Sequence, residues 1–218
     1  MMAWNVELGK QISMAILVIM MILIIAKYKK IEKVNLFFFL GYMMLSLNDF
    51  FFYFFAKLTN SMTEKYYSIC IAIVFFMYLV YYYKLLYIPL LKKIQSILLL
   101  LYFINVFGIS FIEESFFQHL SFNILYINIL LLIFSIILFL YQTFNSDKIF
   151  EIKNYFPFWI SVGSLIFYVG IIPLFFFRTK VSYDIFAIII FILNLINNGV
   201  IVFGLFWNKP DIAKPEEL

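Results

Sequence analysis

The 218-residue sequence has little charge, few glycines and prolines, one cysteine and one histidine. Charged residues make up 13% of the chain, about half their share in soluble globular domains. The single cysteine, Cys70, excludes an intrachain disulfide, and the single histidine, His119, excludes sites that need two imidazoles. Hydrophobic residues instead make up 66% of the chain, with 30 phenylalanines. A soluble fold of this size could not bury so much apolar surface, so lipid is its expected solvent.

Seven apolar runs are each long enough to cross the ~30 Å hydrocarbon core of a bilayer. They show no period-2 alternation, which favours helices over strands. We therefore predict an all-α, polytopic integral membrane protein: one seven-helix transmembrane domain over residues 1–207 and a cytoplasmic tail over 208–218. The N-terminus lacks a basic region and a cleavage site, so the first helix is expected to remain in the mature protein. The predicted helices span residues 9–26, 34–56, 66–86, 94–112, 120–141, 157–177 and 183–207.

The basic residues fall mostly on one side of this predicted topology. Of the 16 lysines and arginines, 11 belong to the connections after the first, third and fifth helices and to the tail. The positive-inside rule then places the C-terminus in the cytoplasm and the N-terminus outside, as expected for a multi-pass protein of a bacterial inner membrane. Because topology accounts for the net positive charge, nucleic acid is not an expected partner. The 11 residues are Lys27, Lys29, Lys30, Lys33, Lys84, Lys92, Lys93, Lys148, Lys153, Lys209 and Lys214.

The second predicted helix contains an acidic residue, Asp49, with Asn48 beside it. Charge at membrane depth is costly and usually faces other helices or water. One interpretation is a site for a ligand, a cation or a proton. The other is a structural carboxyl group, neutralised by burial, that forms a hydrogen bond with a neighbouring helix.

The last predicted helix carries three asparagines, Asn194, Asn197 and Asn198. Their spacing of three and four residues puts them on one helical face. Asparagine in a membrane seeks partners on other helices, so this face is expected to look into the bundle. It could serve only to join helices, or it could form a polar pocket with Asp49.

Small residues in the last two predicted helices indicate close helix packing, because they let backbones approach one another. Tyrosines at the end of the third predicted helix, and the three tryptophans, are expected to form aromatic belts at the membrane surfaces. The packing residues are Gly163, Ser164, Gly170 and Gly199. The belt residues are Tyr81, Tyr82, Tyr83, Tyr87, Trp4, Trp159 and Trp207.

Signatures of membrane enzymes are incomplete. The segment from Gly108 to Ser110 is similar to part of the motif of intramembrane serine proteases, but Phe111 stands where a second glycine is required. Residues 183–207 contain no lysine, which excludes a retinal Schiff base in the last helix. There is no glycine-rich phosphate loop and no acidic metal motif. We therefore predict a non-enzymatic protein with no cofactor and no metal.

The last third of the chain carries a family resemblance. The sixth apolar run opens with Phe158-Trp159 and continues through a pattern that includes Gly163, Tyr168 and Gly170. The last run combines the asparagine face with an aromatic end. On these features, residues 150–207 resemble small seven-helix membrane proteins of Bacteroidota, a mostly uncharacterised group. Because that group is similar to the membrane sensor modules of histidine kinases, the resemblance implies signalling.

These expectations favour a sensory or accessory membrane subunit. Since the chain has no kinase domain, it would act through another membrane or cytoplasmic protein, with the bilayer as its other partner. A structural or assembly subunit of a larger membrane complex is the first alternative. A small-solute transporter with Asp49 as a proton- or ion-coupling group is the second, and a lipid-modifying enzyme ranks last.

Overall fold

The computed structural model describes residues 6–27, 31–59, 64–108, 121–177 and 179–207. Within these residues the regular structure is entirely helical, which confirms the predicted all-α class. The tail over 208–218, His119 and Trp4 lie outside the described residues. The elements are α1 (Val6–Ala26), α2 (Asn35–Thr59), α3 (Glu64–Leu85), α4 (Pro89–Phe103), a π-helical turn η2 (Ile104–Gly108), α6 (Phe122–Phe144), a 3-10 turn η3 (Asp147–Glu151), α7 (Phe156–Phe176) and α8 (Tyr183–Trp207).

The fourth helix differs most from its predicted range. It begins at Pro89 rather than at 94. Proline is well suited to the first helical position, because its fixed φ matches the helix and its missing N–H would have no partner there. Lys92 and Lys93 therefore lie in the first turns of α4 and not in a loop. After Phe103 the helix widens into the π-helical turn up to Gly108.

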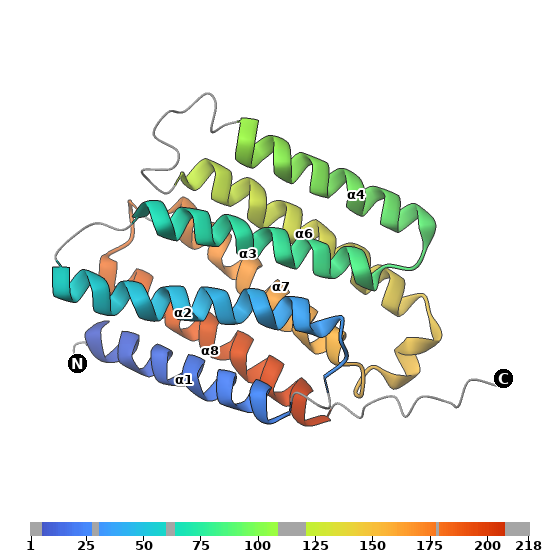
Figure 1. Ribbon diagram of the computed structural model, residues 1–218, viewed down its shortest axis with the longest axis horizontal. Helices are drawn as coiled ribbons and strands as arrows, with labels where there is room; N and C mark the ends of the chain where they lie inside the picture. The colour runs from blue at the N-terminus through green and yellow to red at the C-terminus, as the bar shows by residue number, and fades with distance from the viewer. Residues whose placement is uncertain (1–5, 28–30, 60–63, 109–120, 178, 208–218) are drawn as a thin grey trace.

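The helices lie side by side with their axes roughly aligned, as Figure 1 shows. Helix α3 lies in the middle and contacts α2, α4 and α6. Helix α8 packs between α7 and α1. The two N-terminal helices and the two C-terminal helices thus form one half of the bundle, and α4 lies at the far edge of the other half.

Five of these helices, α3, α4 with its π-helical extension, α6, α7 and α8, are long and apolar enough to cross a membrane. In α1 the apolar part is the shorter stretch Gln11–Ala26. Large apolar side chains cover the outside of the bundle, among them Ile22, Leu47 and Phe134. Apolar surface on this scale is foreign to soluble monomers. The arrangement is that of a membrane-embedded helical protein.

Two residues of the predicted aromatic belt are core residues instead. Tyr81 and Tyr82 are 0% and 1% exposed, because α3 is surrounded by other helices. The Tyr81 hydroxyl donates a 2.9 Å hydrogen bond to Asn35 Oδ1 on α2. The Tyr82 hydroxyl lies 3.2 Å from Ser161 Oγ on α7. Tyr81 and Tyr82 therefore join α3 to α2 and α7 and do not lie at the membrane surface as expected.

The remaining belt residues vary in exposure. Tyr87 and Trp207 are exposed, as belt residues should be, whereas Tyr83 is only partly exposed. Trp159 is half-buried between α7 and α8, and its indole N–H donates a 3.0 Å hydrogen bond to the carbonyl of Lys153.

Three glycines bring α7 and α8 together. A Cβ atom on Gly163 would lie 2.9 Å from Asn197 Oδ1, and one on Gly170 would lie 2.5 Å from Leu193 Cδ2. On the α8 side, a Cβ on Gly204 would lie 2.3 Å from Trp159 Cβ. Gly199 was expected to pack in the same way, but it is exposed and a Cβ there would meet nothing within 4 Å. The expectation for Gly199 is therefore wrong.

Buried amides join the helices of the other half. Gln142 on α6 accepts hydrogen bonds from the backbone N–H groups of Tyr87 and Ile88, at 2.9 and 3.1 Å. Its own amide donates a hydrogen bond to the carbonyl of Leu85 at 3.2 Å, so this one side chain bonds to three backbone groups at the α3–α4 connection. In the π-helical turn, Asn105 donates to Asn128 Oδ1 on α6 at 2.9 Å. These bonds satisfy polar groups that lipid could not.

Candidate functional site

One face of α2 is polar near the middle of the helix. Tyr42, Ser46 and Asp49 follow one another at intervals of four and three residues, so their side chains share this face. The hydroxyl of Ser46 donates a 2.8 Å hydrogen bond to the carbonyl of Tyr42, one turn earlier. The polar face therefore turns toward the bundle, while Leu40, Leu47 and the other outer residues of α2 remain apolar.

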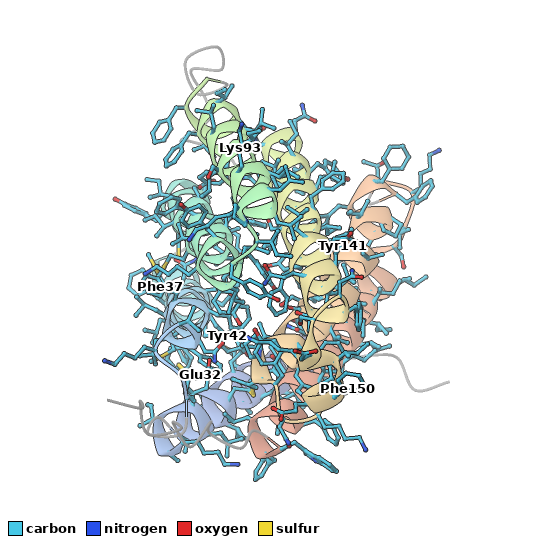
Figure 2. All side chains as sticks on the ribbon, turned by 90° about the vertical axis from the view of Figure 1, so that its right-hand side faces the viewer. Glu32, Phe37, Tyr42, Lys93, Tyr141 and Phe150 are labelled. Atoms are coloured by element: carbon cyan, nitrogen blue, oxygen red, sulfur yellow. The ribbon has the colours of Figure 1, made fainter. Side chains whose placement is uncertain are left out.

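The asparagines of α8 lie opposite this face. Asn198 is buried, and Asn194 and Asn197 are partly buried. The Tyr42 hydroxyl donates a 2.7 Å hydrogen bond to Asn198 Oδ1, which joins α2 to α8 across the bundle. Figure 2 shows Tyr42 on the side of α2 that faces the other helices. The asparagine face of α8 thus turns inward, as predicted from its spacing.

Between these two faces lies a cavity of about 110 Å³. It brings together four of the residues that the sequence predicted for a polar site: Asp49, Asn194, Asn197 and Asn198. Asn48 does not line it. Ser164, predicted as a packing residue, does. The cavity is lined by Ser13, Ile16 and Leu17 of α1, Phe38, Tyr42, Leu45, Ser46 and Asp49 of α2, Tyr78 of α3, Ser164, Phe167 and Tyr168 of α7, and Phe191, Asn194, Leu195, Asn197 and Asn198 of α8.

The cavity lies at mid-height in the bundle. Most of its lining residues lie about two turns or more from either end of α1, α2, α7 and α8, whereas Phe38 lies in the first turn of α2. Midplane cavities between helices are where membrane proteins commonly place their ligand and ion sites.

Polar groups around the cavity are only partly satisfied. Asp49 is hydrogen-bonded to the hydroxyl of Tyr67 on α3. Asn197 Oδ1 is buried and has no hydrogen-bond partner among the described residues. It lies against Gly163 of α7, where an added Cβ atom would come within 2.9 Å of it. Asn48 Nδ2, just outside the cavity, also lacks a partner in the described part of the chain.

The charge of the wall favours a cation or a neutral polar molecule over an anion. Asp49 is the one acidic side chain among the described lining residues, and none of these is a lysine, arginine or histidine. The hydroxyls of Ser13, Tyr42 and Ser46 and the asparagine amides add oxygen atoms, the atoms that hard cations prefer. No cluster of three or more His, Cys, Asp or Glu side chains occurs within the described ranges.

The size of the cavity limits its occupant to a few heavy atoms. Its volume of about 110 Å³ is smaller than the ~150 Å³ of an engineered cavity that accommodates benzene. Several water molecules, a monovalent cation with part of its hydration, or a small amine would fit. A lipid or a sugar would not.

Several contributors to the site escaped the sequence analysis. Tyr42 is the most important, because it bridges the two polar faces. Its position seven residues before Asp49 puts it on the same side of the helix, two turns away, and that spacing could have indicated it. Tyr67 and Tyr168 carry no such spacing signal, since they lie on other helices of unknown register.

Comparison with known proteins finds no matching family, no matching curated protein and no matching solved structure.

Proposed function

We propose that this chain is a seven-helix inner-membrane protein that binds a small cation or a small polar solute at Asp49. Binding would make it a sensory or accessory subunit that acts through a partner protein. The observation that carries the proposal is the midplane cavity, which one carboxylate and three asparagines line. None of its described lining residues is basic.

The dimensions of the first two helices support seven crossings. Helices α1 and α2 have 21 and 25 residues, which correspond to about 32 and 38 Å along the axis. Both lengths suffice for the ~30 Å hydrocarbon core. Both helices also lie alongside the five apolar ones (Figure 1), with apolar outer residues such as Ile19 on α1 and Leu40 on α2.

The distribution of lysines supports a cytoplasmic C-terminus. Lys27 directly follows α1, Lys84 lies in the last turn of α3 and Lys148 follows α6, so all three belong to the end of the bundle where α8 finishes. Lys92, Lys93 and Lys153 belong to the same end. Cytoplasmic faces carry such an excess of basic residues.

Helix α8 is the element best suited to pass on a change in the cavity. It supplies the asparagine wall and, in the same helix, reaches the lysine-rich end of the bundle. There the Lys27 ammonium lies 3.4 Å from the carbonyl oxygen of Leu205 and 3.4 Å from the centroid of the Phe206 ring. A small shift of α8 on ligand binding would therefore move the surface around Lys27, where a cytoplasmic partner could detect it.

The binding step can be tested with the detergent-solubilised full chain. Thermal unfolding is followed in sodium chloride, methylammonium chloride and tetrapropylammonium chloride at equal ionic strength. We expect the two small cations to raise the unfolding temperature relative to the large one, because a ligand that binds only the native state stabilises it. Asp49→Asn should abolish the difference. Equal unfolding temperatures in all three salts for the wild-type chain would refute binding of a small cation at Asp49.

Transport is a second candidate function, and the depth of Asp49 favours it. A carboxylate in a midplane cavity is a typical coupling group in secondary transporters. Uptake of methylammonium into vesicles that contain the protein would then depend on a pH gradient and would be lost in Asp49→Asn. Binding without uptake would favour the sensory role.

An assembly role is the third candidate, and affinity purification separates it from sensing. A stoichiometric complex that is unchanged by Asp49→Asn would support assembly. A complex whose stability depends on Asp49 or on the small cation would support sensing.

A further inference from the structure

A second hollow opens on the outer surface between α1 and α2, and it shares no residue with the cavity at Asp49. It has a volume of about 480 Å³. Every side chain that lines it is apolar. The lining residues are Ile24 and Ile25 of α1 and Leu36, Phe37, Phe39, Leu40 and Met43 of α2. We call it the α1–α2 groove.

The groove occupies the part of the bundle next to the lysine-rich end. Ile24 and Ile25 lie in the last turn of α1, and the α2 residues run from its second residue, Leu36, to Met43. Seven residues of helix rise by about 10 Å, roughly one third of the ~30 Å hydrocarbon core. The groove therefore lies within one leaflet, on the side of the lysines.

The walls of the groove face outward. Ile25 is 63% exposed and Leu40 is 59% exposed. Phe37 lies on the outer side of α2, as Figure 2 shows, whereas Tyr42 points to the interior. The same two turns of α2 thus separate the groove from the cavity. In a bilayer, the molecules that reach an outward apolar hollow first are lipid chains.

A positive charge lies at the groove. The Lys84 ammonium is 3.8 Å from the centroid of the Phe37 ring, and Phe37 is a lining residue. The Lys84 side chain is exposed. Its ammonium group has three N–H donors, and a phosphate oxygen can accept a hydrogen bond from any of them. Lys33 and Glu32 in the α1–α2 connection are both exposed, and their opposite charges offset one another, which leaves Lys84 as the charge that selects the lipid.

We propose that the α1–α2 groove binds one acyl chain of an anionic phospholipid, whose phosphate contacts Lys84. An apolar hollow of 480 Å³, with an ammonium packed on the ring of one lining residue, Phe37, matches an amphiphile with an apolar chain and a negative head. A zwitterionic lipid also carries a phosphate, but its own cationic group offsets that charge, so Lys84 favours the lipid whose headgroup has a net negative charge. This site does not depend on what occupies the cavity at Asp49.

Native mass spectrometry of the full chain tests the proposal. The protein is mixed with equal amounts of phosphatidylglycerol and phosphatidylcholine with identical chains, and the retained lipids are counted. We expect about fivefold preference for phosphatidylglycerol, because the attraction between one lysine and an anionic headgroup raises the affinity by about that factor. Leu40→Trp should fill the groove and lower the retention of both lipids. Lys84→Gln should remove the preference and leave the retention of phosphatidylcholine unchanged.

Matched variants at other outward positions are the controls. Leu47→Trp makes the same change on the same face of α2, where Leu47 is 55% exposed and does not line the groove. Lys93→Gln removes an exposed lysine from the same end of the bundle. Neither control should alter retention or preference. The proposal is overturned if Leu40→Trp behaves like Leu47→Trp, if the preference survives in Lys84→Gln, or if a second copy of the chain occupies the groove and excludes lipid.

Discussion

The hydroxyl of Tyr42 and Oδ1 of Asn198 are 2.7 Å apart and join α2 to α8 beside the cavity. Both residues are buried, and the helices that carry them are 156 residues apart in sequence at this contact. The bond therefore holds together an early and a late segment of the chain, and it joins the two polar faces that line the cavity.

Loss of this hydrogen bond should weaken the fold measurably. In Tyr42→Phe the aromatic ring remains and Asn198 loses its donor. Hydrogen bonds between membrane helices contribute about 0.6 kcal/mol on average and up to about 1.7 kcal/mol. We expect a loss in this range, measured as the free energy of unfolding in mixed micelles. Tyr66→Phe is the control, because Tyr66 is 65% exposed. An unchanged stability in Tyr42→Phe would show that the bond is dispensable.

Two glycines of α8 should respond in opposite ways to alanine. In Gly204→Ala the new Cβ would lie 2.3 Å from Trp159 Cβ, so α7 and α8 must separate. Overpacking of this kind costs about 1–3 kcal/mol. In Gly199→Ala the new methyl group meets nothing within 4 Å, and the better helix propensity of alanine should leave stability equal or up to about 1 kcal/mol higher.

The comparison of these two variants uses the same chemical change, five positions apart on one helix. Thermal unfolding of both proteins, measured in the same detergent, is sufficient. If Gly199→Ala proves the more damaging of the two, the packing of α8 against α7 described above is incorrect.

Gln142 should control the dynamics of the α3–α4 connection. In Gln142→Leu the N–H groups of Tyr87 and Ile88 lose their acceptor while the volume of the side chain is nearly kept. Loss of a partly buried hydrogen bond costs about 0.5–1.5 kcal/mol. Hydrogen exchange of the peptide that contains residues 85–90 should therefore become faster. Gln11→Leu, a change at an exposed position of α1, should leave exchange in that peptide as it is.

Cys70 should react with thiol reagents only when the bundle opens. It is 8% exposed, and its sulfur lies 3.8 Å from the carbonyl oxygen of Met44 on α2. Because it is the one cysteine of the chain, the intact mass reports its modification directly. N-ethylmaleimide should label it slowly in mild detergent and rapidly after unfolding in dodecyl sulfate.

A relocated thiol calibrates the rate of this labelling. The double variant Cys70→Ser, Tyr66→Cys carries its thiol at an exposed position near the start of α3. It should be labelled rapidly in both detergents. If Cys70 of the native protein reacts as fast as the relocated thiol of the double variant, the burial of Cys70 within α3 is contradicted.

The helices could be predicted from sequence because each is a long apolar run, and lipid leaves the backbone no alternative to helix. The polar cavity was also foreseeable in part. Asparagines at intervals of three and four must share a face, and that face avoids lipid. Asp49 belongs to a different helix, and its partnership with this face was a hypothesis that only the arrangement of helices could test.

Other features could not be predicted, because they depend on which helix lies at the centre. Tyr81 and Tyr82 belong to a helix that is apolar on every side, so no periodicity reveals its surroundings. Their position near a helix end favoured a belt, whereas packing made them core residues. Gly199 differs, since it follows Leu195 and Ile196 at intervals of four and three and shares their exposed face. The spacing of Gly199 from these two apolar residues therefore indicates a lipid-facing position, and the prediction that it packs against another helix is wrong.

The central helix α3 is tied to its neighbours by side-chain hydrogen bonds in three directions: to α2 through Tyr81, to α7 through Tyr82 and to α4 through the amide of Gln95 on the carbonyl of Leu79. A helix held on three sides in this way should move less than the helices that surround it. Helices α1 and α8 contact each other, and each also borders the cavity. We therefore expect any change in the volume of the hollow at Asp49 to come from α1 and α8 and not from α3.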